Sequence, residues 1–218
     1  MTPQCAKAID PVFLYVLGLL DRISSDENPS PQDEQARIEA VLDRAGLAVG
    51  HSAEWELAEY ALLCWIDEVL IESPWSGHSW WLNNTLEFKR RKTTLANEQF
   101  YVRAKEASTL KSRDALEVFY VCAVLGFRGL YRDPQAAAVL AESRGLPPDL
   151  ETWAKQSAMS IRLGQGRPPI HETGATGSGA PPLTGQALMI GSVLIGIFLL
   201  ALVLIFGLEG LEFFLPKS

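Results

Sequence analysis

The chain has few of the residues from which metal sites and disulfide frameworks are built. It contains three cysteines and three histidines: Cys5, Cys64, Cys122, His51, His78 and His171. No pair of cysteines has CxxC spacing, and the histidines lie on three different segments. We therefore expect no metal and no other cofactor. Cys64 and Cys122 lie in apolar helical runs and are predicted to be buried free thiols, which suits a reducing compartment.

Motifs of common catalytic sites are also absent. The sequence contains no GxSxG, no GxxxxGK[ST] and no HExxH. Asp67 and Glu68 are adjacent, but neighbours on a helix point about 100° apart and do not share a face. We expect one of them to be half-buried and bonded to an arginine or a backbone donor. The sequence favours a non-enzymatic protein. The rival is a tail-anchored enzyme using Asp67, Glu68 and His78, which requires all three side chains in one cleft.

Positive charge is scarce as well. Residues 1–185 carry 18 basic and 24 acidic side chains, a net charge of −6. This balance argues against general nucleic-acid binding and against broad adsorption to anionic lipid. The local exception is Lys89-Arg90-Arg91-Lys92. Such a run is more typical of a solvated helix end or loop, and a local docking patch is the alternative.

Ionisable groups are missing from one long stretch, residues 187–208. Fifteen of these 22 residues are Leu, Ile, Val or Phe. As a helix the stretch would rise about 33 Å, against roughly 30 Å of bilayer hydrocarbon, and its insertion would be favourable by about 6 kcal/mol. We predict a single transmembrane helix over residues 186–208. Small residues four apart are candidate helix-packing positions within it: Ala187, Gly191, Ser192 and Gly196.

The position of this span divides the rest of the chain. Residues 1–163 are predicted to form a helical domain. Residues 164–185, ten of which are Gly or Pro, are predicted to be a linker, about 26 Å in root-mean-square length as a flexible chain. Residues 209–218 form a short tail. Asp10 and Pro11 interrupt the approach to the first apolar run, so it does not resemble an export signal, and we expect the domain to be cytoplasmic.

Helical periodicity runs through the domain, without a strand pattern or an internal repeat. A capping residue precedes a proline at Asp10-Pro11 and at Ser30-Pro31, which predicts a helix start at each. Gly46 is the expected stop of the second helix. The expected helices are residues 10–24, 31–46, 52–72, a short helix ending near 86, 97–107, 115–127, 134–144 and 149–163. The fold class is therefore all-α, a helical bundle, with 115–127 as its most buried, central helix.

Three tryptophans are concentrated in the stretch after Pro74, which reads Trp75-Ser76-Gly77-His78-Ser79-Trp80-Trp81. Tryptophan rings commonly lock a loop onto a core, and this is one interpretation. The other is an exposed aromatic loop that contacts a partner or a membrane, because aromatic residues dominate interface hot spots. Both interpretations remain open from the sequence.

Two segments about 50 residues apart resemble the DotU/IcmH family, also called TssL. The first is Asp67-Glu68-Val69-Leu70 followed by Ser73-Pro74-Trp75. The second runs from Glu117-Val118-Phe119-Tyr120 through Leu125-Gly126-Phe127-Arg128-Gly129-Leu130-Tyr131-Arg132. A single C-terminal membrane helix also fits this family. Two places depart from it: Asn97–Tyr101 replaces a Gly-Gly-Glu-(Lys/Arg)-Phe-Phe-like stretch, and Arg128 stands where the family is often acidic.

The resemblance implies a structural inner-membrane subunit of a type VI secretion system, with a related type IVB system as the alternative. It implies a mostly helical cytoplasmic domain, a homodimer and a complex with the large IcmF/TssM membrane protein. It also implies that the cytoplasmic domain docks the baseplate of the contractile apparatus. We accordingly expect a single-pass protein of the bacterial inner membrane with a periplasmic C-terminus, and no nucleic acid among its partners.

The ends of the two motif helices form the expected partner-binding surface. If they meet, Asp67 or Glu68 finds an arginine partner and the tryptophan loop is held beside them. We expect Asp67 to be the buried structural carboxylate and Glu68 to be an exposed docking residue whose loss spares the fold. The candidate partner-binding residues are Asp67, Glu68, Glu72, Trp75, Trp80, Trp81, Arg128 and Arg132.

Overall fold

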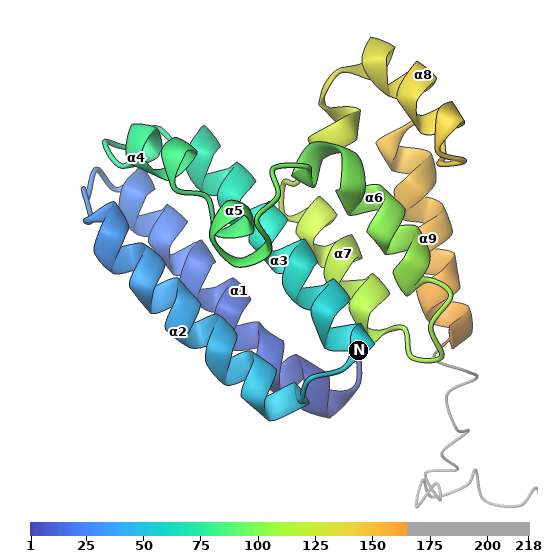
Figure 1. Ribbon diagram of the computed structural model, residues 1–218, viewed down its shortest axis with the longest axis horizontal. Helices are drawn as coiled ribbons and strands as arrows, with labels where there is room; N and C mark the ends of the chain where they lie inside the picture. Colours follow the sequence, from blue (N-terminus) through green and yellow to red (C-terminus); the bar gives the residue numbers. More distant parts are fainter. Residues whose placement is uncertain (165–218) are drawn as a thin grey trace, which may run out of the picture. The chain divides into compact units, whose positions relative to one another are not determined.

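The part of the chain that the structure describes, residues 1–164 of a computed structural model, is built from helices and contains no strand. The all-α prediction is therefore confirmed for this part (Figure 1). The elements are α1 (Pro3–Ser24), α2 (Pro31–Val49), α3 (Ala53–Glu72), α4 (His78–Asn83), α5 (Leu86–Arg91), α6 (Ala96–Ala107), α7 (Asp114–Val124), the 3-10 helix η1 (Gly129–Arg132), α8 (Pro134–Ser143) and α9 (Leu150–Gly164).

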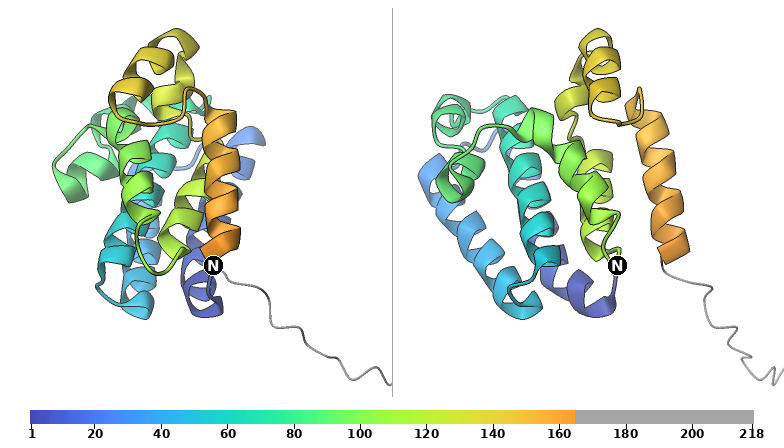
Figure 2. Two further views of the ribbon diagram at one scale, coloured as in Figure 1. Left: turned by 90° about the vertical axis from the view of Figure 1, so that its right-hand side faces the viewer. Right: turned by 45° about the vertical axis from the view of Figure 1, so that its right-hand side comes forward.

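Helix α3 is the central element. It lies between the α1–α2 hairpin on one side and α6 and α7 on the other, and α9 packs on the outer side of α7 (Figures 1 and 2). Thirteen of its 20 residues are buried, against six of 11 in α7. The expectation that 115–127 is the central helix was wrong. Even the carboxylates Asp67 and Glu68 of α3 are buried.

The first helix begins seven residues earlier than expected, at Pro3 and not after Asp10. Thr2 caps it, and Asp114 at the start of α7 accepts hydrogen bonds from the Thr2 backbone N–H (2.7 Å) and hydroxyl (2.6 Å). Pro11 lies inside the continuous helix, although a proline removes one backbone hydrogen bond there. A contact between the two helices therefore stabilises a first turn that the local sequence left undecided.

The second helix continues past its expected stop. Gly46 is buried within α2, and a Cβ atom added to it would lie 2.9 Å from the Trp55 indole nitrogen. The helix ends at Val49, where Gly50 takes a positive φ of 86°. Gly46 therefore serves the close approach of α3 to α2, and Gly50 supplies the left-handed conformation that ends the helix.

The basic run lies on α5, a helix that the sequence did not predict in this form. Arg90 pairs with Asp43 of α2 (2.7 Å) and with Glu59 of α3 (2.9 Å), while Arg91 also pairs with Glu59 (2.6 Å). Lys89 pairs with Glu39 of α2 (2.7 Å). Three of the four cations therefore fasten α5 to α2 and α3, which supports the structural interpretation of this run.

Two further predictions from the sequence concern the cysteines and the membrane segment. Cys64 and Cys122 are buried free thiols, as predicted, and Cys5 is one as well. None of the helices within residues 1–164 is long and apolar enough to cross a membrane. The predicted span, the short tail and nearly all of the linker lie outside the described residues, as do the candidate packing positions Ala187, Gly191, Ser192 and Gly196.

Candidate functional site

The two motif segments meet at one end of the domain. Helix α7 ends in a tight turn in which Phe127 N–H donates to the Cys122 carbonyl (3.0 Å) and Gly126 N–H donates to that of Ala123 (3.3 Å). Gly126 adopts a φ of 120° there, which a residue with a side chain rarely adopts. The turn brings the backbone of Arg128 and Gly129 to the C-terminal half of α3.

Glu68 on α3 receives this turn. Its carboxylate accepts hydrogen bonds from the backbone N–H groups of Arg128 (2.6 Å) and Gly129 (3.2 Å), and Arg132 forms a salt bridge with it at 2.9 Å. Glu68 is buried, so the expectation of an exposed docking carboxylate was wrong. The sequence raised the possibility that the two motif helices meet at their ends and predicted an arginine partner in that case, but it did not predict the contacts to backbone N–H groups.

Arg128 does not supply the arginine partner. Its guanidinium donates to the carbonyls of Ala123 (2.9 Å) and Phe127 (3.2 Å) at the end of α7. A cation at this place complements the negative end of the helix dipole. Arg132 pairs with Glu68 and also with Glu72.

Asp67 is buried, as expected, and its partners hold the segment that follows α3. It accepts hydrogen bonds from the Trp81 indole N–H (2.9 Å) and from the backbone N–H groups of Leu86 and Glu87 (both 2.8 Å). Burial raises the pKa of Asp67 to about 7, an effect that these hydrogen bonds only partly offset. Asp67 thus fixes α4 through the Trp81 indole and the first turn of α5 through two backbone donors, and no arginine among residues 1–164 bonds to it.

Glu87 is a third buried carboxylate, and sequence reasoning missed it. It accepts hydrogen bonds from the Thr93 hydroxyl (2.9 Å) and from the backbone N–H groups of Leu95 (3.0 Å) and Ala96 (3.2 Å), with the Tyr60 hydroxyl at 3.3 Å. It therefore caps the start of α6, which has no side-chain cap of its own. The absence of a capping side chain at Leu95 was the sequence feature that could have indicated a distant carboxylate as the cap.

The tryptophan stretch is held on the core. Trp81 is fully buried, and the Trp75 indole N–H donates to the Leu70 carbonyl at 3.0 Å. The two rings lie 6.3 Å apart between centroids, and a Cβ on Gly77 would clash with the Trp75 ring at 2.5 Å. The locking interpretation is therefore confirmed for Trp75 and Trp81, while Trp80 is half-buried.

A groove of about 400 Å³ opens between α3, the α4–α5 segment, the start of α6 and η1. Asp67, Glu68 and Glu87 contribute to its wall, and Glu72 and Arg132 stand at its rim with side chains 44% and 50% exposed. Leu82 adds an apolar side chain that is 54% exposed. We call this the α3–α6 groove; it joins the candidate residues Asp67, Glu68, Glu72 and Arg132.

The cleft that the rival enzyme hypothesis requires, with Asp67, Glu68 and His78 together, is not formed. The Nδ1 atom of His78 lies against the Ile71 carbonyl, and His78 does not line the α3–α6 groove. Within residues 1–164, no group of three or more His, Cys, Asp or Glu side chains is placed to hold a metal ion. The groove thus presents hydrogen-bonded carboxylates beside an apolar rim.

Comparisons with known proteins identify the fold and the family of the chain. The solved cytoplasmic domain of TssL from Acinetobacter baumannii has a similar fold, with a TM-score of 0.58, 22% sequence identity, and coverage of 75% of this chain and 99% of that domain. No curated protein matches the chain. The family model described as type VI secretion system protein DotU matches residues 5–211, which is most of the chain. The chain therefore belongs to the DotU family of type VI secretion system proteins.

Proposed function

We propose that this protein is a structural, non-enzymatic inner-membrane subunit of a type VI secretion system, whose helical domain docks other components at the α3–α6 groove. The observation that carries the proposal is the groove itself. Both family motifs form its walls, and their buried carboxylates are held by hydrogen bonds at Asp67 and Glu68. A rigid wall loses little conformational freedom when a partner binds.

The lining of the groove indicates the chemistry of its partner. Asp67, Glu68 and Glu87 have no cationic partner among the described residues apart from Arg132, which pairs with Glu68. Glu68 and Glu87 therefore make the groove negative inside, Asp67 adds to this charge only above its raised pKa of about 7, and the apolar side chains of Leu82 and Ile71 lie beside them. A partner segment that places an apolar side chain next to a lysine or arginine complements both features.

The remaining partners follow from family membership. We propose the baseplate as the component that enters the groove, and the large IcmF/TssM protein and a second copy of this chain as partners within the membrane complex. The family description favours type VI over type IVB secretion. The proposed topology, with residues 1–163 cytoplasmic and one C-terminal span, rests on the apolar run of residues 187–208. Protease added to intact spheroplasts should leave the domain uncut.

Replacement of Leu82 tests the docking role. Leu82→Ser removes an exposed apolar side chain from the groove, and because Leu82 is 54% exposed the fold should persist. We expect lost recruitment of baseplate proteins and lost secretion. The matched control is Leu47→Ser on α2, where the side chain is 78% exposed and outside the groove. A Leu82→Ser protein that melts like wild type and still recruits the baseplate would overturn the proposal.

A further inference from the structure

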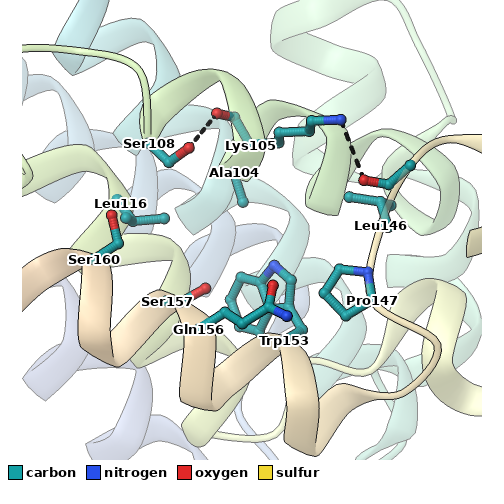
Figure 3. A pocket seen from close by; sticks show the side chains of 11 residues that line it. Ala104, Lys105, Ser108, Leu116, Leu146, Pro147, Trp153, Gln156, Ser157 and Ser160 are labelled. Atoms are coloured by element: carbon teal, nitrogen blue, oxygen red, sulfur yellow. Dashed lines mark hydrogen bonds between the residues drawn. The ribbon is translucent and has the colours of Figure 1, made fainter.

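A second pocket lies between α6, α7 and α9, at the opposite side of the domain from α4 (Figures 1 and 3). Its volume is about 260 Å³. Leu116, Leu146 and Pro147 supply apolar walls, and the inward face of α9 forms one side. None of the residues of the α3–α6 groove lines it. We call it the α6–α9 pocket.

The inward face of α9 contains a serine where an apolar residue is expected. Trp153, Ser157 and Ile161 follow at four-residue spacing and all three are buried, which places them on one face of the helix. Ser157 is only 7% exposed, yet its hydroxyl forms no hydrogen bond with any of residues 1–164. Its side chain lines the α6–α9 pocket (Figure 3). The Ser157 hydroxyl is not one of the fully buried side-chain atoms that lack a partner, so solvent reaches it through the pocket and it is free to bond to a ligand there.

Trp153 presents a second donor without an acceptor. The residue is 4% exposed, and Tyr101 packs edge-to-face on its ring with centroids 4.9 Å apart, which fixes the orientation of the indole. The indole N–H has no hydrogen-bond acceptor within the described part of the chain. Figure 3 draws the Trp153 ring among the side chains that line the pocket. The buried indoles of Trp75 and Trp81 donate to the Leu70 carbonyl and to Asp67, whereas the buried indole of Trp55, like that of Trp153, has no acceptor among residues 1–164.

The charge of the pocket differs from that of the domain. Residues 1–185 are acidic overall, but within residues 1–164 Lys105 is the one charged residue that lines this pocket, and no Asp or Glu of this part lines it. The Lys105 ammonium donates to the Gly145 carbonyl at 3.2 Å (Figure 3), which leaves two of its three N–H groups available. The pocket therefore offers donors from Lys105, Trp153 and Ser157 beside apolar walls.

We propose that the α6–α9 pocket anchors a carboxylate borne on an apolar group of a partner protein. A planar carboxylate accepts several hydrogen bonds at once, which matches donors on two sides of the pocket. Phosphate is the weaker match, because arginines and long-helix N-termini typically bind it and neither lines this pocket. The volume is below the range of roughly 300–1,000 Å³ typical of drug-sized ligands, so the occupant is a side chain or C-terminal residue that obtains further affinity from the surface around it.

The tryptophan indole signals provide a direct test. The chain has six tryptophans, so the full-length protein in detergent micelles, labelled with ¹⁵N at its indoles, gives six signals, and Trp153→Phe identifies the relevant one. We expect phenylacetate to shift the Trp153 signal saturably and to leave the other five unmoved. Neutral phenylacetamide, which has the same ring, should bind at least about tenfold more weakly, because charge-assisted hydrogen bonds are stronger.

Variants of the chain separate the pocket from unspecific effects. Lys105→Gln should weaken phenylacetate binding about tenfold and Ser157→Ala about threefold. The control is Ser24→Ala at the end of α1, which does not line the pocket. The Ser24 hydroxyl donates to the Asp21 carbonyl three residues earlier. This variant should bind phenylacetate like wild type. Equal shifts from phenylacetate and phenylacetamide, or an unmoved Trp153 signal, would overturn the proposal.

A peptide distinguishes a partner from a free small acid. N-acetyl-Gly-Phe with a free C-terminus should bind at least as tightly as phenylacetate, and its C-terminal amide should not. If phenylacetate binds and the peptide acid does not, the pocket takes free acids and the partner is excluded. The inference deepens the proposed docking function, but its test uses neither baseplate nor secretion. Failure of the Leu82→Ser experiment and failure of this one are therefore separate results.

Discussion

The Glu68 carboxylate accepts a hydrogen bond from the backbone N–H of Arg128 at 2.6 Å, across 60 positions of the chain. A second bond comes from Gly129, so a side chain of α3 caps the turn that follows α7. Removal of the carboxylate would leave both backbone donors buried without an acceptor. The pairing of the two family motifs therefore has a structural cause, whatever partner the groove binds.

Glu68→Ala should destabilise the domain. Two unsatisfied backbone donors and an unpaired Arg132 would cost about 2–4 kcal/mol, of which the half-exposed Arg132 contributes the smaller part. The melting temperature of the full-length protein in detergent should fall by roughly 5–15 °C. The control is Glu72→Ala, whose side chain is 44% exposed and pairs with the same arginine; it should melt close to wild type. Equal melting of the two variants would contradict the capping role.

Asp67 should give stability a distinctive pH dependence. Its folded pKa is raised to about 7 by burial, from an ordinary value of 3.8. Between these values the unfolded chain loses the proton and the folded chain keeps it, so the stability due to Asp67 is full below pH 4 and decreases by about 1.4 kcal/mol per unit up to pH 7. The free energy of unfolding of wild type minus that of Asp67→Asn should therefore increase as the pH is lowered from 7 to 4.

The comparison for this titration is Asp10→Asn, which changes an exposed carboxyl on α1. Its difference from wild type should vary little over the same range. A difference between wild type and Asp67→Asn that stays constant between pH 4 and 7 would show that Asp67 is ionised throughout. Chemical denaturation of the full chain at fixed detergent concentration measures both variants.

The helices with clear local signals were predictable, and those fixed by distant contacts were not. Ser52 and Glu72 bound α3 within one residue of the prediction, because capping and Pro74 act locally. The start of α1 was missed because Asp114, 112 positions away, bonds to Thr2. The end of α2 was missed because Gly46 serves to admit the Trp55 ring.

The candidate site, like the fold, was predictable only where local sequence determines it. The sequence identified Asp67, Glu72 and Arg132 as neighbours of one surface, since two motifs contain them. It could not show that Glu68 bonds to backbone, because the donors depend on the turn at Gly126. The sequence could not identify Glu87 either. Its carboxylate accepts hydrogen bonds from the start of α6 only after α5 has packed against α3 and brought it there.

Two glycines should respond oppositely to the same substitution. Gly46→Ala places a Cβ 2.9 Å from the Trp55 indole in a buried contact, and such overpacking should cost about 1–3 kcal/mol. Gly18→Ala in α1 meets nothing within 4 Å and should stabilise the protein by about 0.5–1 kcal/mol, because alanine favours a helix. Thermal melting of the two variants checks the signs; a stabilised Gly46→Ala would show that α2 and α3 separate without penalty.

Arg90 should control the rigidity of the groove wall. Its guanidinium joins α5 to Asp43 of α2 and to Glu59 of α3, at 2.7 and 2.9 Å. Arg90→Met removes both pairs while keeping an apolar stem, so α5 should open more often. The backbone amides of Leu86 and Glu87, which donate to Asp67, should then exchange with solvent deuterium faster, by about tenfold if the lost pairs contribute about 1.4 kcal/mol.

Lys92→Met is the matched control for this change. Lys92 ends the same basic run, but among the described residues its ammonium donates to the Lys89 carbonyl alone and lies 5.7 Å from the Phe88 ring centroid. It joins no other helix, so its loss should leave the exchange of Leu86 and Glu87 unchanged. If Arg90→Met and Lys92→Met exchange alike, the ion pairs do not hold α5. The alternative outcome is that Arg90→Met alone accelerates amide exchange at Leu86 and Glu87. If this variant also recruits less baseplate, and its melting temperature stays within a few degrees of wild type, then the groove must be rigid in order to dock its partner.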